Sequence, residues 1–81
     1  MNFKVGHNDV GYEPEREPLV TTDLQLARQL LSNEARRWFQ PDLAGDEPEM
    51  SMIELNRLLL SINTLPQCSK LCLRGRVFWI Q

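Results

Sequence analysis

The sequence has no long hydrophobic run and almost no net charge. None of its apolar stretches approaches the ~20 consecutive residues that a membrane-spanning helix needs. The N-terminus also lacks the apolar segment of a secretory signal peptide, so we expect a cytoplasmic protein without membrane contact. A formal net charge of −2 argues against a surface that is basic throughout and grips nucleic acid.

Cysteine, histidine and glycine are also scarce. Cys68 and Cys72 are four positions apart, whereas small secreted scaffolds usually carry four or more cysteines, so we expect two free thiols with at least one of them buried. A zinc site needs four ligands and His7 is the only other good candidate, so we expect no metal and no cofactor. The four scattered glycines form neither a phosphate-binding loop nor a dinucleotide fingerprint.

The sequence also lacks any recognisable catalytic arrangement. No nucleophile or orienting acid lies near His7 in the sequence, and no serine stands in a Gly-x-Ser-x-Gly setting. A chain of 81 residues forms one domain, residues 1–81, with a small core and little room for a deep cavity. We therefore expect no enzyme, no catalytic residue and no small-molecule substrate.

The hydrophobic pattern predicts an α+β fold. Residues 3–7 alternate like a half-buried strand, and the two prolines in residues 11–18 predict an extended connector. Three- and four-residue spacing predicts helices over 22–39 and 51–63, each opened by a capping box, the first at Thr22 and the second at Ser51. The second apolar stripe runs from Met52 to Ile62, and residues 40–49 are expected to form a loop.

Residues 71–80 are β-prone on both sides of Gly75. They form either a hairpin or one strand with a bulge at this glycine. The predicted order is β-α-α-β(-β), with the two helices packed on a small antiparallel sheet.

Charge is distributed unevenly along the chain. Residues 1–49 have a net charge of −5 and residues 50–81 a net charge of +3. The acids gather in two proline-bounded loops, which can face a partner's lysines and arginines. The predicted partner-binding residues are Tyr12, Glu13, Glu15, Glu17, Asp46, Glu47 and Glu49. One of the aromatic pairs at 38–39 and 78–79 is expected to add to this contact or to fill the core.

The basic residues near the C-terminus suggest an alternative. On a hairpin tip, two arginines could contact DNA phosphates in the manner of a winged helix. The predicted helix 51–63, however, offers few side chains that read bases. The alternative nucleic-acid-binding residues are Arg57, Lys70, Arg74 and Arg76.

Residues 11–18 read Gly-Tyr-Glu-Pro-Glu-Arg-Glu-Pro and precede an amphipathic helix and an aromatic closing strand. This layout resembles small phage and prophage accessory proteins with a Gly-Tyr-x-Pro-Glu-x-x-Pro segment. The resemblance implies an origin in a phage or mobile element and action by binding, as in the anti-CRISPR proteins, which inhibit a host nuclease complex. It transfers no site residue to this chain.

Together these observations predict a protein-binding module. Its expected partner is a host protein or ribonucleoprotein complex, and its expected action is inhibition of a host defence (CRISPR-Cas) or nucleic-acid-handling complex through the acidic surface. The alternative is a winged-helix transcriptional regulator. A third hypothesis is a homodimer that buries the aromatic residues.

Overall fold

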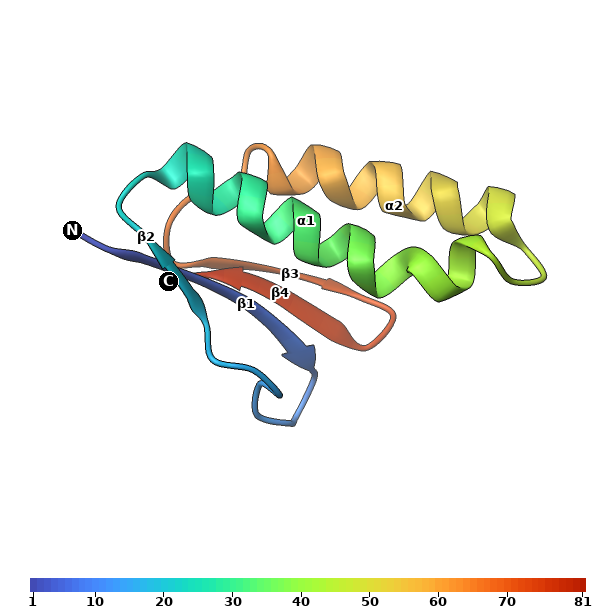
Figure 1. Cartoon of the computed structure of the whole chain (residues 1–81), viewed down its shortest axis with the longest axis horizontal. Coiled ribbons are helices and arrows are strands. Elements are labelled where there is room, and N and C mark those ends of the chain that lie inside the picture. The colour runs from blue at the N-terminus through green and yellow to red at the C-terminus, as the bar shows by residue number, and fades with distance from the viewer.

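Alternating apolar residues place the first and last strands side by side at the centre of a four-stranded antiparallel sheet (Figure 1). The computed structural model describes all 81 residues. Two helices cover one face of the sheet, which confirms the predicted α+β fold, and the strand order is β2-β1-β4-β3. The elements are β1 (Phe3–Asp9), β2 (Leu19–Thr21), α1 (Leu24–Leu43), α2 (Pro48–Ile62), β3 (Ser69–Leu73) and β4 (Arg76–Ile80).

The core lies between the sheet and the helices. Val5 of β1 pairs with Ile80 of β4, and the next inward pair joins His7 to Phe78. Val5, Phe78 and Ile80 are fully buried, as the two-residue alternation predicts. On the helical side, α1 buries Ala27, Leu31 and Ala35 as the predicted spacing requires. The stripe ends on the buried Phe39 and not, as expected, on Trp38, which is only partly buried.

Helix α1 begins and ends later than the predicted range 22–39. Its N-cap is Asp23, whose Oδ1 accepts a hydrogen bond of 2.9 Å from the Gln25 N–H, so the capping box predicted at Thr22 is wrong. The helix continues through Pro41 to Leu43, which packs against the core. The proline removes one hydrogen bond near the end of the helix, and the packing of this last turn outweighs that loss.

Helix α2 begins before the predicted Ser51. Pro48 occupies the first turn, where a missing N–H leaves no bond unmade, and Glu47 is the N-cap without a side-chain hydrogen bond. The second capping box is therefore wrong, since Ser51 lies inside the helix and is buried. Met52, expected in the stripe, is 44% exposed, and the predicted loop 40–49 shrinks to residues 44–47.

The two outer strands differ in how well the sequence predicts them. Strand β2 was not expected, because three residues are too few for a visible alternation; it pairs with β1 from Phe3 to Val5. Of the two alternatives for residues 71–80, a hairpin or one bulged strand, the structure contains the hairpin, in which β3 pairs with β4. Arg74 and Gly75 have φ angles of 53° and 74°, and a two-residue turn with both φ angles positive matches the twist of a hairpin.

Candidate functional site

The two acidic loops lie apart from each other. The connector between β1 and β2 carries Glu13, Glu15 and Glu17, all exposed. The loop between α1 and α2 carries Asp46 and Glu47, and Glu49 follows in the first turn of α2. Figure 1 shows the connector turning back from the end of β1 toward β2 and the second loop at the far end of the helix pair, so the acids form two patches.

These six acids are the ones that the fold leaves without a partner. Of the eleven acidic residues, Asp9, Glu34, Asp42 and Glu54 each form an ion pair, and Asp23 caps α1. None of the six predicted partner-binding acids takes part in an ion pair or a side-chain hydrogen bond within the chain. Their charge therefore faces solvent uncompensated.

Tyr12 is presented by the first of these loops. The residue is 75% exposed, and Val10, two positions before it, is exposed as well. Its backbone is held in place, since its N–H donates to the Asp9 carbonyl at 3.0 Å and its carbonyl accepts from Asn8 at 2.9 Å. The ring is thus free for contact while the chain that carries it is fixed.

The other aromatic residues divide between core and surface. Phe39 and Phe78 are fully buried, whereas Trp38 and Trp79 are partly exposed. Trp38 makes edge contacts with both phenylalanines. One member of each pair therefore fills the core and the other reaches solvent.

The alternative basic set does not form one patch. The Arg74 guanidinium donates to Glu54 at 2.7 Å and to Asp42 at 2.6 Å. Both carboxylates raise the pKa of Arg74, Glu54 more than Asp42, and the hydrogen bond from Arg74 lowers the pKa of Glu54. The Arg76 side chain is only 9% exposed and lies on the helical side of the sheet. Arg57 and Lys70 are exposed on separate elements. Because a winged-helix contact needs two free arginines, this geometry does not support the winged-helix alternative.

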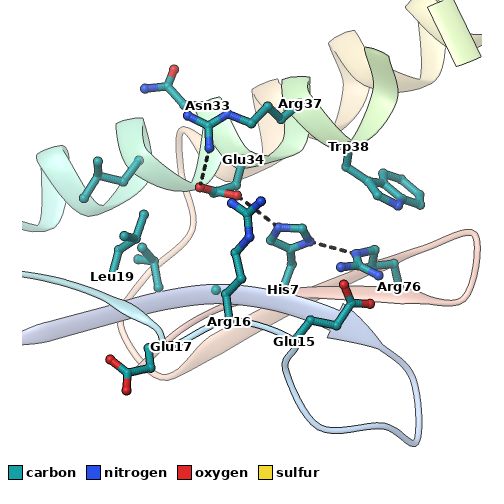
Figure 2. Close-up of a pocket in the computed structure, with 13 residues that line it drawn as sticks. His7, Glu15, Arg16, Glu17, Leu19, Asn33, Glu34, Arg37, Trp38 and Arg76 are labelled. Atoms are coloured by element: carbon teal, nitrogen blue, oxygen red, sulfur yellow. Dashed lines mark hydrogen bonds and ion pairs between the residues drawn. The ribbon is translucent and has the colours of Figure 1, made fainter. Parts of the chain in front are cut away.

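A polar cavity of about 470 Å³, which no sequence pattern predicts, lies between the connector, β1 and α1 (Figure 2). Its floor includes His7, Glu34 and Arg76, which come from β1, α1 and β4. Arg37 and Trp38 of α1 line one side, and residues 15–17 of the connector line the other. The alternation that places His7 inward was the only signal in the sequence, because its partners lie 27 and 69 positions away.

The His7 ring is held by a hydrogen bond on each side. The Arg76 Nε–H donates to Nδ1 at 2.7 Å, so Nδ1 carries no proton, and we assign the proton to Nε2, which donates to Glu34 at 3.3 Å. The ring also stacks on Phe78 at a centroid distance of 5.3 Å. Asp9 balances the charge of Arg76 through a contact of 2.7 Å. Because both ring nitrogens are engaged, His7 in this arrangement has no lone pair free to accept a substrate proton.

The surroundings of His7 favour its neutral form. Burial lowers the pKa of this imidazole below its usual 6.5; the hydrogen bond to Glu34 opposes the shift, and the charge of Arg76 adds to it. A second proton on Nδ1 would also face the Arg76 Nε–H and break that hydrogen bond.

We expect the single histidine to titrate with a midpoint below pH 6.5 in the folded protein, as measured by NMR of its ring protons. Glu34→Gln should lower the midpoint further, because the carboxylate supports the charged ring. The contribution of neutral His7 to the free energy of unfolding is then fully present above pH 6.5. It is lost as the pH falls from 6.5 through the lower folded-state pKa, because the unfolded chain takes up the proton first. A midpoint at or above 6.5 would contradict this assignment.

The structure places both cysteines at the surface. Cys68 and Cys72 are free, as expected, but both are exposed, so the expectation that one is buried is wrong. The reason is that Cys72 lies on the open face of β3 and Cys68 in the turn before it.

No three His, Cys, Asp or Glu side chains gather closely enough to hold a metal ion. Neither helix combines the length and the apolar character needed to cross a membrane.

In comparisons with known proteins, no family model, no curated protein and no solved structure matches this chain.

Proposed function

We propose that this chain is a protein-binding module whose acidic loops engage a basic surface of a partner protein or ribonucleoprotein. The proposal rests on where the paired and the unpaired acids lie in the fold. Every acid of the strands and of the body of the helices has a partner in the chain, whereas the six acids at Glu13, Glu15, Glu17, Asp46, Glu47 and Glu49 have none.

Two patches of uncompensated acids can speed association with a basic partner and discriminate against acidic proteins. Exposed charges attract an oppositely charged partner and accelerate association, and they repel acidic competitors. Tyr12 supplies what charge alone does not, because an exposed aromatic ring on a fixed backbone can bury area at little entropic cost. The connector would therefore be the principal contact and the α1–α2 loop a second one.

The resemblance to phage and prophage accessory proteins supports a more specific proposal. In this view the partner is a host defence complex of the CRISPR-Cas type, or another complex that handles nucleic acid, and the acids occupy lysines and arginines that otherwise hold phosphates. The protein would act in the cytoplasm of the host cell, without a cofactor and without catalysis.

Charge reversal in the connector tests the proposal. Glu13→Lys, Glu15→Lys and Glu17→Lys combined should slow association with a partner captured from the host by about ten-fold or more at low salt, as measured by surface plasmon resonance. The triple reversal of Asp46, Glu47 and Glu49 should have a smaller effect of the same sign. Both variants should also weaken the dependence of the association rate on salt.

Glutamine and asparagine variants at the same six positions are the matched control, because they remove charge without adding the opposite sign. They should slow association less than the lysine variants do. All of these positions are exposed, so the unfolding free energy should change by less than about 0.5 kcal/mol per substitution. Unchanged association of both triple reversals would refute the acidic-surface proposal.

A further inference from the structure

Both helices lie on one face of the sheet, and no helix covers the other face (Figure 1). Strand residues alternate between the two faces, and the buried ones all point toward the helices. The outward-facing strand residues are Lys4, Gly6, Asn8, Val20, Lys70, Cys72, Val77 and Trp79. This face therefore holds both lysines of the chain and no acid, in a protein with a net charge of −2.

Trp79 is fixed on this face by two features. Gly6 is its neighbour on β1, and a Cβ added there would lie only 2.6 Å from the indole Cζ2, so the ring covers the bare glycine backbone. The indole N–H donates to the Asn8 Oδ1 at 2.7 Å. Asn8 is itself tied to the Tyr12 carbonyl. One side of the ring thus rests on the sheet, and the partly exposed residue offers the other side to solvent.

The two lysines flank this ring. Lys70 of β3 is the direct cross-strand neighbour of Trp79, on the side opposite Gly6. Lys4 lies two residues from Gly6 on the same face of β1. Neither ammonium group forms an ion pair within the chain, so both charges are available to a ligand.

We infer that this open face binds single-stranded nucleic acid, with a base stacked on Trp79 and backbone phosphates on Lys4 and Lys70. A rigid aromatic ring between cations is the combination that single strands need, because each base offers a stacking face and each phosphate a negative charge. A base inside a duplex is already stacked on its neighbours on both faces, so it has no free face for Trp79. A second copy packed face to face would bring four lysines together with no acid on this face to balance them. This face adjoins the start of the acidic connector through Asn8, but the inference rests on Lys4, Lys70 and Trp79, none of which the proposed function uses.

Fluorescence of Trp79 tests the inference directly. In Trp38→Phe, Trp79 is the only remaining tryptophan, and a short oligothymidylate should quench its emission. Two phosphate contacts predict that log K falls with log salt concentration with a slope of about −1.4, since each contact to a single strand contributes about −0.7. A duplex of equal length should bind more weakly.

A pair of charge-reversal variants gives the matched comparison. In the Trp38→Phe background, Lys4→Glu with Lys70→Glu should lower the affinity for oligothymidylate by about ten-fold or more. Arg36→Glu with Arg57→Glu makes the same change in net charge on the exposed side of the helices and should lower it by less than about three-fold.

Four outcomes would overturn the inference: no quenching at low salt, equal losses in the two double variants, equal quenching by polyglutamate, and tighter binding to duplex DNA. A concentration-dependent dimer of wild-type protein, detected by sedimentation and lost on adding charge at Lys4 and Lys70, would also overturn it, because a second copy would then cover the face.

Discussion

Phe78→Ala is expected to remove about 3–5 kcal/mol from the free energy of unfolding. The phenylalanine is fully buried, stacks on His7 and contacts the edge of Trp38 at 5.6 Å between centroids. A domain of 81 residues has only about 4–12 kcal/mol of stability, because so small a core barely exceeds the lost chain entropy. The substitution should therefore unfold a large fraction of the protein.

Val77→Ala is the matched control for this prediction. Val77 is the adjacent residue on the open face of β4 and is only half-buried. We expect it to cost about 1 kcal/mol or less, because little of the side chain leaves an apolar environment. Urea unfolding followed by far-UV circular dichroism measures both. Equal losses would contradict the assignment of the core to the helical side.

Gly6→Ala is expected to destabilise the protein by about 1–3 kcal/mol, although it adds a single methyl group. The new Cβ would lie 2.6 Å from Cζ2 and 2.7 Å from Cη2 of Trp79, well inside van der Waals contact. The indole must swing away and give up its hydrogen bond to Asn8. In the Trp38→Phe background, Trp79 emission should shift to longer wavelength as the ring enters water.

A double-mutant cycle separates this clash from a general intolerance of β1. Trp79→Ala removes the obstructing ring, so Gly6→Ala should cost at least 0.5 kcal/mol less in that background, a threshold taken from the usual scale of coupling between contacting residues, about 0.5–3 kcal/mol. Gly45→Ala serves as a control, because its Cβ would approach nothing closer than 3.4 Å. Additive effects at positions 6 and 79 would show that the ring does not rest on the glycine.

Much of the fold could be predicted because its signals are local. The alternation of Phe3, Val5 and His7 and the spacing of the α1 stripe each report one buried face. The helix ends could not be predicted in the same way. A Ser-x-x-Glu pattern at 51–54 satisfies the rule for a cap, but tertiary packing extends α2 past it to Pro48 and buries the serine.

In the candidate site, too, only the residues with a local sequence signal could be predicted. The six uncompensated acids could be found from the sequence, since loops bounded by proline stay at the surface. The roles of Arg74 and Arg76 could not be found from the sequence. Arg74 and Arg76 look equivalent beside a glycine, yet alternation sends Arg76 under α1 to His7 and Asp9, while the turn directs Arg74 to Glu54 and Asp42.

By itself the sequence determined the class of the fold, the inward face of β1 and the location of the exposed acids, because each depends on neighbours within a few residues. Only the tertiary structure decided which charges are neutralised and which surfaces stay open. The His7 cavity joins residues up to 69 positions apart. Trp79, Lys70 and Lys4 lie together on the open face only because β4 lies between β1 and β3. Contacts of that range are set by strand order, which no local pattern encodes.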